Sequence, residues 1–330
     1  MIDPITGESI AKKSAGAVSW TKVFSNHLID IANEREDVVA ITAAMAGPTG
    51  LADFAKAHPS RTYDVGIAEQ HAVTSAAGLA LGGLHPVVAV YSTFLNRAFD
   101  QLLMDVALLK LGVTLVLDRA GITGSDGASH NGMWDLSITG IVPGIHVAAP
   151  RDARTLELAL DRAVAIDDAP TVVRFPKGNA PAAVPAVREE ADYDVLFEQS
   201  AEADGSHGTV LIVSFGALTD QAIGAAEALL GANFSATVID PHWVVPTAHS
   251  VLELARDYDL IVTIEDNGVH GGAGSRLHYD LSQVGIDVPV RNLGVPQKFL
   301  AHASRGEVLE ELGLDVETVA QTVVGYAEKL

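Results

Sequence analysis

The sequence contains no cysteine, few aromatic residues and few basic residues. The absence of cysteine excludes disulfides, thiolate metal ligands and a cysteine nucleophile. Aromatic residues make up 5% of the 330 residues and hydrophobic residues 48%, so the core must be built mainly from aliphatic side chains. Lys and Arg number 21 against 42 Asp and Glu, a net charge of −21. Such a chain repels phosphate backbones and anionic membranes, so we expect neither nucleic acid nor a membrane as a partner.

The chain also lacks a hydrophobic run long enough to cross a bilayer. Residues 1–20, MIDPITGESIAKKSAGAVSW, contain no apolar segment of the kind that a signal peptide needs. These two absences predict a cytoplasmic protein.

Short aliphatic runs alternate with amphipathic segments from residue 19 onward. The runs are continuous rather than alternating with polar residues, which is typical of parallel strands covered on both faces. Residues 20–34 and 96–110 are predicted to be helices, the second closed by Gly112. The series predicts an α/β fold with doubly wound, mostly parallel sheets. The expected strands of the first half lie at residues 38–45, 86–91, 113–118, 146–150 and 171–176.

A change of composition divides the chain into two α/β units. Residues 179–208 are rich in Pro and Ala, then acidic, and they end in GSHG. This composition is typical of a linker, with room for a short strand. We therefore assign residues 1–18 to an N-terminal tail, 19–178 to a first domain, 179–208 to a linker and 209–330 to a second domain.

The second unit repeats the pattern of the first. SRGE at residues 304–307 has the spacing of a helix capping box. HGGAGSR at residues 270–276 lacks the full spacing of a dinucleotide-binding loop and is predicted to be a tight turn that opens a helix. The expected strands lie at residues 209–215, 235–240, 260–266 and 289–293.

A carboxyl group lies at the start of a segment of small residues. In YDVGIAEQHAVTSAAGLALGG, residues 63–83, the polar residues Glu69, Gln70 and His71 precede a run rich in Ala, Gly and Ser. Small residues allow close packing, so we expect Glu69 to be buried, and a buried carboxyl is costly unless it is paired or neutral. Glu69 is therefore either a helix N-terminal carboxylate stabilised by the helix dipole or a catalytic group.

Two further polar stretches follow expected strands, namely YSTFLNRAFDQ at residues 91–101 and the Gly-rich DRAGITGSDGASHNG at residues 118–132. Ligands of open parallel sheets bind at the carboxyl ends of strands, so these stretches are candidates for one site. The plainer alternatives are core aromatics and a solvated loop histidine. GSDGASHN, within the second stretch, lacks the spacing of a Gly-Asp-Gly…Asn diphosphate-binding motif, and we expect no metal ligands in this chain. The candidate side chains are Tyr91, Phe94, Arg97, Arg119, Asp126 and His130.

Together these motifs carry a family resemblance. DVGIAEQHAV, YSTFLNRAFDQ, DRAGITGSDGASHNG, DLS and VRFPKGN, in this order and spacing, closely resemble the 1-deoxy-D-xylulose-5-phosphate synthase family. The resemblance is most specific over residues 38–178, and beyond residue 208 the chain resembles the transketolase C-terminal domain. It implies a transketolase-like pyrimidine-binding domain followed by that domain. It also implies a thiamine-diphosphate enzyme that condenses pyruvate with glyceraldehyde 3-phosphate and releases carbon dioxide, for isoprenoid and thiamine precursor synthesis.

The resemblance also implies a cofactor site. Glu69 would bond a ring nitrogen of the cofactor's aminopyrimidine and so promote removal of the thiazolium proton. Phe94 would stack on the aminopyrimidine, with Tyr91 and Arg97 beside it.

A substrate site is implied in the same way. Arg119 would hold the phosphate of glyceraldehyde 3-phosphate. Lys177 stands where the family usually has Arg, so it keeps the charge but loses the bidentate geometry. Asp126 and His130 would line the substrate pocket and assist proton transfers.

The family enzyme is about twice as long as this chain. Its N-terminal half carries a Gly-Asp-Gly…Asn motif that holds Mg²⁺ and the cofactor diphosphate, and these 330 residues contain no such motif. The resemblance thus implies a separate diphosphate-binding chain or domain, inactivity of this chain alone, and a homodimer or heterotetramer. A transketolase C-terminal subunit, a 2-oxoacid dehydrogenase beta-type subunit and a non-catalytic interaction module remain alternatives.

Overall fold

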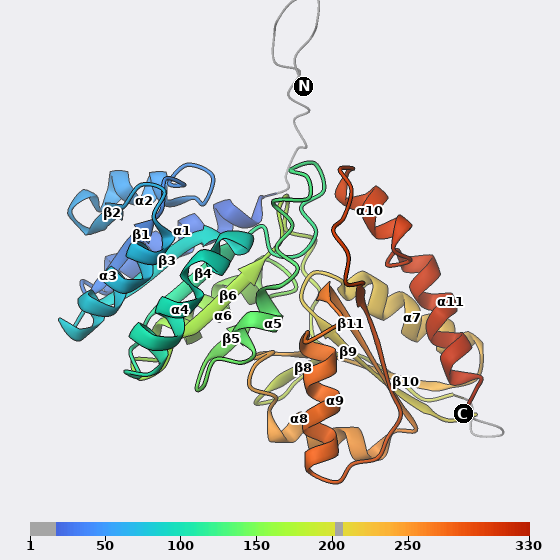
Figure 1. Cartoon of the computed structure of the whole chain (residues 1–330). Coiled ribbons are helices and arrows are strands. Elements are labelled where there is room, and N and C mark those ends of the chain that lie inside the picture. The colour runs from blue at the N-terminus through green and yellow to red at the C-terminus, as the bar shows by residue number, and fades with distance from the viewer. Residues whose placement is uncertain (1–17, 202–206) are drawn as a thin grey trace, which may run out of the picture.

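Two six-stranded sheets, each covered by helices on both faces, lie side by side in the computed structural model (Figure 1). The structure describes residues 18–201 and 207–330, so the predicted tail of residues 1–18 lies, apart from Val18, outside the described residues. The prediction of an α/β fold with mostly parallel sheets is confirmed. Among the helices of the described ranges, none has the length and apolar character that a bilayer crossing requires.

The first sheet is entirely parallel, with strand order β2-β1-β3-β4-β6-β5. All five strands expected in this half are present. The sixth, β2, has three residues, too few to produce a recognisable pattern. The bounds are β1 Val38–Thr42, β2 Thr62–Asp64, β3 His85–Tyr91, β4 Thr114–Asp118, β5 His146–Ala148 and β6 Thr171–Phe175.

Helices cover both faces of this sheet. The predicted helix over residues 20–34 is confirmed, and the Ser19 hydroxyl caps it by accepting from the Lys22 amide at 3.2 Å. Side chains of α1, α2 and α6 pack on one face, and those of α3, α5 and the segment after β3 pack on the other. The bounds are α1 Trp20–Glu34, α2 Leu51–Ala57, η1 Pro59–Arg61, α3 Glu69–Leu81, α5 Asp135–Thr139 and α6 Ala153–Val164.

The helix expected over residues 96–110 differs from the prediction in type and in its ends. Lys110, with φ 53°, takes the left-handed position that was predicted for Gly112. Gly112 is instead required by close packing, because a Cβ there would lie 2.6 Å from the Asp167 Cα. The segment is a 3₁₀ helix η2 Ser92–Ala98, one α-helical turn α4 Phe99–Gln101 and a π-helix η3 Leu102–Ala107.

The second sheet has strand order β12-β11-β9-β10-β8-β7. Its four expected strands are present and parallel to one another. Within the predicted linker, β8 pairs antiparallel with β10, and β7 pairs antiparallel with β8. The linker segment therefore supplies one edge of this sheet. The bounds are β7 Arg188–Glu189, β8 Tyr193–Gln199, β9 Thr209–Phe215, β10 Ser235–Pro241, β11 Leu260–Gly268 and β12 Val290–Val295.

Two local predictions for the second unit are confirmed. Ser304 and Glu307 form a capping box: the Ser304 hydroxyl accepts from the Glu307 amide at 3.3 Å, and the Glu307 carboxylate accepts from the Ser304 amide at 2.8 Å. HGGAGSR turns at Gly271, with φ 74°, and opens α9. The bounds are α7 Thr219–Gly231, α8 His249–Leu254, η4 Ala255–Asp257, α9 Ala273–Gln283, α10 Arg305–Glu311 and α11 Val316–Ala327.

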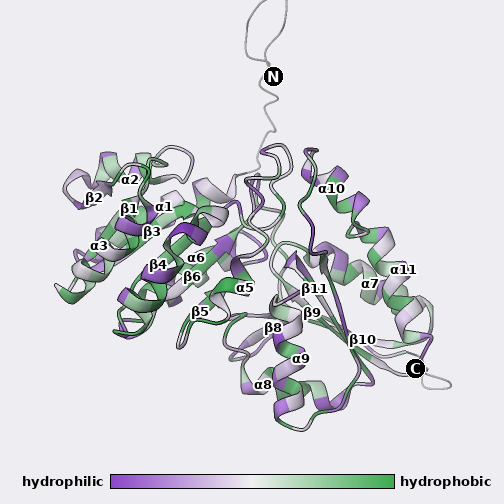
Figure 2. Cartoon of the chain, in the orientation of Figure 1, coloured by the Kyte–Doolittle hydropathy of each residue, from purple (hydrophilic) through white to green (hydrophobic). Residues whose placement is uncertain are grey.

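The two units share a hydrophobic core and backbone hydrogen bonds. One cluster of buried side chains runs from α3 and β5 of the first unit to β8, β9 and α9 of the second. Green hydrophobic segments occur in the helices and the strands of both units (Figure 2). The Val147 amide donates to the Val245 carbonyl at 2.7 Å, and the Val244 amide donates to the Val147 carbonyl at 2.7 Å. These shared contacts fix the orientation of the two units.

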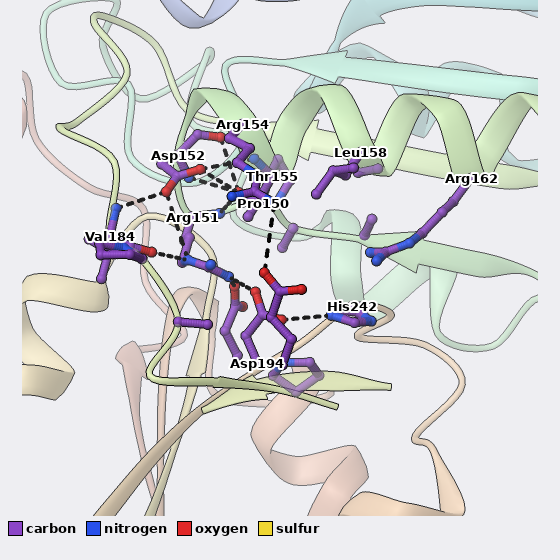
Figure 3. Close-up of a pocket in the computed structure, with 18 of the residues that line it drawn as sticks. Pro150, Arg151, Asp152, Arg154, Thr155, Leu158, Arg162, Val184, Asp194 and His242 are labelled. Atoms are coloured by element: carbon purple, nitrogen blue, oxygen red, sulfur yellow. Dashed lines mark hydrogen bonds and ion pairs between the residues drawn. The ribbon is translucent and has the colours of Figure 1, made fainter. Parts of the chain in front are cut away.

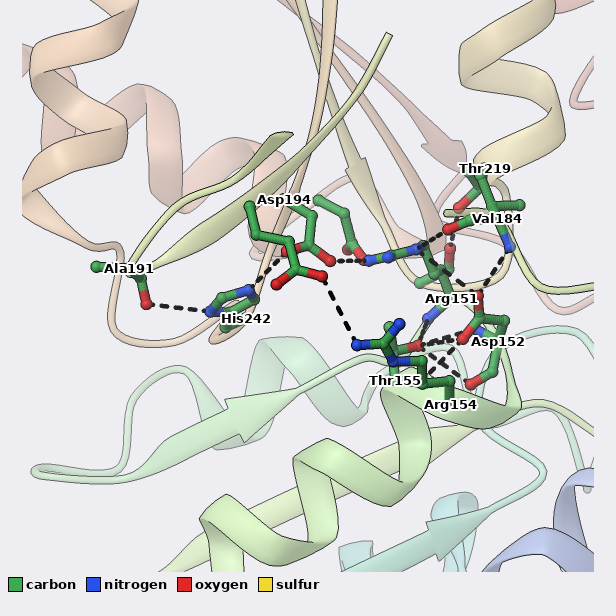
Figure 4. Close-up of polar contacts among 12 residues, drawn as sticks. Arg151, Asp152, Arg154, Thr155, Val184, Ala191, Asp194, Thr219 and His242 are labelled. Carbon is green, nitrogen blue, oxygen red and sulfur yellow. Dashed lines mark hydrogen bonds and ion pairs between the residues drawn. The ribbon is translucent and has the colours of Figure 1, made fainter. Parts of the chain in front are cut away.

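A buried charged cluster also joins the units. Arg151 follows β5, and its guanidinium donates to Asp194 on β8 at 2.6 Å and to Asp240 on β10 at 2.7 Å. It also donates to the Val184 carbonyl at 3.1 Å, and His242 lies 3.1 Å from Asp194 (Figure 4). The cluster lines a cavity of about 310 Å³ between α6 and the second sheet (Figure 3).

The Asp240 carboxyl is expected to make the stability of the fold depend on pH. Burial raises its pKa from 3.8 to about 7, although Arg151 opposes the shift. Between these two values the folded protein binds more protons than the unfolded chain, so this group makes the free energy of unfolding fall as pH rises. The slope is up to about 1.4 kcal/mol per pH unit.

We predict that Asp240→Asn mimics the protonated carboxyl. The melting temperature of this variant minus that of the wild type should therefore increase as pH rises from 5 to 8. Thermal unfolding across this range measures the difference. Asp220→Asn, at an exposed position on α7, is the matched control and should show no such trend. If the difference in melting temperature between Asp240→Asn and the wild type is the same at all pH values, the raised pKa of Asp240 is not the cause of a pH-dependent stability.

Candidate active site

Glu69 begins α3 and is buried, as the small residues after it predict. Its side chain is 5% exposed, and the carboxylate atom Oε2 has no hydrogen-bond partner among the described residues. The nearest cation is Arg97, whose Nη1 lies 3.9 Å from that oxygen. A helix N-terminus stabilises negative charge, but it does not satisfy Oε2. The atom is therefore available to a hydrogen-bonding ligand.

An aromatic platform lies on the segment that carries Arg97. Tyr91 ends β3 and Phe94 lies in η2, and their rings stack at 5.7 Å between centroids with an interplanar angle of 11°. The His130 ring meets both edge-on, at 5.5 Å from Phe94 and 6.3 Å from Tyr91. Because η2 packs against α3, the platform and Glu69 belong to one region of the molecule.

Arg119 lies above this platform. Its φ of 60° is left-handed, and its guanidinium carbon lies 4.0 Å from the centre of the Tyr91 ring. One nitrogen donates to the Asp118 carboxylate at 2.9 Å and to the Pro48 carbonyl at 3.0 Å. The Nε atom has no hydrogen-bond partner among the described residues, and Asp126 Oδ2 lies 3.7 Å from it. The guanidinium is thus fixed in place while its buried Nε donor is unused.

Lys177 forms an ion pair with Asp126, the carboxylate beside Arg119. The Lys177 ammonium donates to the Asp126 carboxylate and, at 3.2 Å, to the Ser125 hydroxyl. Asp126 thus lies between two cations, Arg119 and Lys177. Such a site can accept an anionic group by releasing the carboxylate.

The structure brings the sequence-predicted residues together in two adjoining groups. The first group combines Glu69 with Arg97. The second combines the aromatic platform with the cationic cluster around Arg119. The second group consists of Tyr91, Phe94, Arg119, Asp126, His130 and Lys177.

Asp118 was not singled out by the sequence. It ends β4, is 1% exposed, and accepts from the Thr21 hydroxyl at 2.6 Å as well as from Arg119. Burial raises the pKa of the Asp118 carboxyl, and Arg119 opposes the shift. Its position at the carboxyl end of an aliphatic run was the available signal, and its role is to hold Arg119.

A buried network beneath the site was also missed. Asp135, the first residue of α5, accepts from Arg174 at 2.7 Å, from Asn267 at 2.8 Å and from the Ser92 hydroxyl at 3.0 Å. These partners come from β6, β11 and the start of η2. DLS at residues 135–137 was recognised as part of a motif, but its partners are too distant in sequence to be inferred.

Family models match most of the chain. Residues 16–182 match the transketolase pyrimidine binding domain, and residues 200–319 match the transketolase C-terminal domain. The first segment contains every predicted site residue.

Curated relatives are similar over the whole chain. The 1-deoxy-D-xylulose-5-phosphate synthase of Corynebacterium jeikeium (strain K411) is 89% identical over 330 residues, which cover 100% of this chain and 52% of the relative. The synthase of the same name from Rhodococcus jostii (strain RHA1) is 62% identical over 327 residues, which cover 99% of this chain and 49% of the relative. The chain therefore spans about half the length of the curated relatives it matches.

Solved structures share the fold. A split gene transketolase, described as an inactive beta4 tetramer, superposes with a TM-score of 0.82 at 29% identity and covers 95% of this chain and 99% of its own. A transketolase of Pichia stipitis in complex with sedoheptulose 7-phosphate gives a TM-score of 0.76 at 19% identity over 96% of this chain and 47% of its own. The chain belongs to the transketolase-like family, and it corresponds to the C-terminal half of the 1-deoxy-D-xylulose-5-phosphate synthases that it matches.

Proposed function

We propose that this chain forms the aminopyrimidine-binding and substrate-binding part of a thiamine-diphosphate-dependent 1-deoxy-D-xylulose-5-phosphate synthase. The reaction joins pyruvate to glyceraldehyde 3-phosphate and releases carbon dioxide. The observation that carries the proposal is the buried Oε2 atom of Glu69, which has no hydrogen-bond partner among the described residues and lies beside η2. The 89% identity to the Corynebacterium jeikeium synthase supports it.

The residues around Glu69 fit an aminopyrimidine ring. Glu69 Oε2 can share a proton with a ring nitrogen, and the flat face of Phe94 can stack on the ring, with Tyr91 and Arg97 beside it. The Arg97 guanidinium, 3.9 Å away, balances the charge of the carboxylate. When bound, thiamine diphosphate supplies the carbanion chemistry, and the protein supplies position and electrostatics.

The cationic cluster fits the phosphate of glyceraldehyde 3-phosphate. Arg119 offers its unused Nε donor, and Lys177 offers its ammonium once the phosphate displaces Asp126. Asp126 and His130 then face the substrate and can move protons between it and solvent. The ammonium of Lys177 acts as a point charge and cannot make the bidentate hydrogen bonds of a guanidinium. It therefore orients the phosphate less strictly than an arginine would.

The described residues do not fit a magnesium ion. Residues 18–201 and 207–330 hold no group of three His, Cys, Asp or Glu placed to bind a metal. We therefore propose that the Mg²⁺ ligands and the diphosphate contacts come from a separate diphosphate-binding chain or domain. The inactive state of the similar split gene transketolase supports this division.

We predict that the purified chain alone has no synthase activity and binds thiamine diphosphate with a Kd above about 0.1 mM, because metal and phosphate contacts anchor such cofactors. Isothermal titration calorimetry in the presence of Mg²⁺ measures the affinity. Addition of the diphosphate-binding half should restore both binding and turnover. Micromolar binding by the chain alone would refute the division of the site.

We also propose a homodimer, or a heterotetramer with the diphosphate-binding half. The end of α3, the π-helix η3 and the two residues after η3 expose apolar side chains, with Leu108 64% exposed. These side chains are Leu81, Met104, Leu108 and Leu109. Exposed apolar side chains gathered in this way mark a protein interface.

Light scattering at micromolar concentration should therefore give at least a dimeric mass, and Leu108→Asp should reduce it to a monomer. Val187→Asp, which alters a similarly exposed side chain elsewhere, should leave the mass unchanged. A monomeric wild type would contradict the interface.

Glu69→Gln should separate a catalytic role from a structural one. Gln preserves the size of the side chain and a hydrogen bond but removes the shareable proton. In the assembly with the diphosphate-binding half, turnover should fall by about 100-fold or more while cofactor affinity changes little.

Exchange of the thiazolium proton, followed by NMR, should slow to the same degree. Glu157→Gln, at an exposed position on α6, is the control and should match the wild type in both measurements. If Glu69→Gln exchanges the thiazolium proton at the wild-type rate, Glu69 has no catalytic role and is only a helix-terminal carboxylate.

A further inference from the structure

The loop between β4 and α5, residues 119–134, carries much of the candidate site, but part of it is buried in the second unit. We call it the site loop. Ile122 is 0% exposed and Met133 is 2% exposed. Both belong to the hydrophobic cluster formed by α7, α11 and the second sheet, with Leu218 and Val295 among its members. The site loop is therefore anchored outside the sheet from which it emerges.

The peptide groups of Ile122 are held by two charged side chains of the second unit. The Ile122 amide donates to Asp266 Oδ1 at 3.0 Å, and its carbonyl accepts from Arg305 Nη1 at 2.8 Å. Asp266 and Arg305 also form an ion pair with each other. Both peptide groups of one loop residue are thus satisfied by one ion pair, which comes from β11 and α10.

Two glycines of the site loop permit this approach. Gly121, with φ 69°, lies where a Cβ would come 2.3 Å from the Asp266 carboxyl carbon. Gly124, with φ 68°, lies where a Cβ would come 2.4 Å from the Arg305 amide nitrogen. Any larger residue would separate the loop from the ion pair, so docking on the second unit accounts for glycine at these positions.

The remainder of the site loop is tied to the anchored part. Gly121 and Gly132 exchange backbone hydrogen bonds of 2.9 and 2.8 Å, and the Asn131 side chain accepts from the Thr123 amide at 2.9 Å. These bonds close the base of the loop around residues 124–130. Asp126 and His130 lie within that closed segment, so a displacement of Ile122 must move both.

We propose that Asp266 and Arg305 are positioning residues, which act through Ile122 to fix the site loop and with it Asp126 and His130. The consequence for substrate binding rests on the function proposed above. The docking itself does not, so the two can be tested separately.

The docking is tested by hydrogen–deuterium exchange of the 330-residue chain. Arg305→Ala and Asp266→Ala should speed exchange in residues 119–134 by about 10-fold or more, because a hydrogen bond to a charged group is lost in each. Asp266→Asn keeps an acceptor for the Ile122 amide and should restore most of the protection. Arg256→Ala, which breaks an exposed ion pair with Glu253 in the same unit, should leave the loop unchanged. Unchanged loop exchange in Arg305→Ala, or an equal rise over the whole second sheet, would overturn the proposal.

The consequence for the site is tested in the assembly with the diphosphate-binding half. Arg305→Ala should raise the KM for glyceraldehyde 3-phosphate by about 10-fold, with a smaller change in the KM for pyruvate, and Arg256→Ala should change neither. An active wild type whose Arg305→Ala variant keeps all its kinetic constants would refute the positioning role. A wild-type assembly that makes no product would instead refute the proposed function, and the exchange result would stand.

Discussion

The buried ion pair of Arg174 and Asp135 is the interaction around which the site is assembled. Arg174 is 4% exposed and Asp135 is 1% exposed, and each makes further hydrogen bonds, with the Asp266 carbonyl and with Ser92 and Asn267. Such a pair is tolerated in the interior only because its remaining donors and acceptors are satisfied. Removal of one partner would leave a buried charge and would release four elements at once. The elements are β6, α5, the start of η2 and the end of β11.

Those elements carry the functional side chains. Ser92 begins the 3₁₀ helix that presents Phe94, and Lys177 lies two residues after the end of β6. The site loop ends where α5 begins, at Asp135. A network of buried charges therefore sets the relative positions of the aromatic platform, the site loop and the lysine, which strand pairing alone would not do.

The electrostatics of the site oppose those of the whole chain. The chain carries a net charge of −21, yet Arg97, Arg119 and Lys177 converge on one region. Each cation has a carboxylate beside it, within 3.9 Å for Arg97 and 2.9 Å for Arg119. The carboxylates hold the cations in place at the cost of partial neutralisation. An anionic ligand must compete with Asp126 for Lys177, so binding of the anion and release of Asp126 are coupled.

The sequence predicts those parts of the structure whose causes are local. Continuous aliphatic runs identify the long strands, and the amphipathic pattern of residues 20–34 identifies α1. The small residues after Glu69 predict its burial, because they require close packing. The three-residue strand β2 and the change from 3₁₀ to π-helix after β3 have no such local signature. The contacts of Ile122 with Asp266 and Arg305 span 144 and 183 residues and depend on how the two units meet.

The Oε2 atom of Glu69 is a buried acceptor whose hydrogen-bonding capacity no described residue satisfies. An unsatisfied buried acceptor costs about 1–3 kcal/mol, and a fold retains it only where the surroundings determine the position. Here the small residues of α3 fix the helix, and η2, held by Ser92 on the Asp135 network, fixes Arg97 and Phe94. The cost is thus borne by a rigid frame, and a ligand that donates to Oε2 recovers it on binding. The described residues thus hold Glu69 in position, but none of them donates a hydrogen bond to its Oε2 atom.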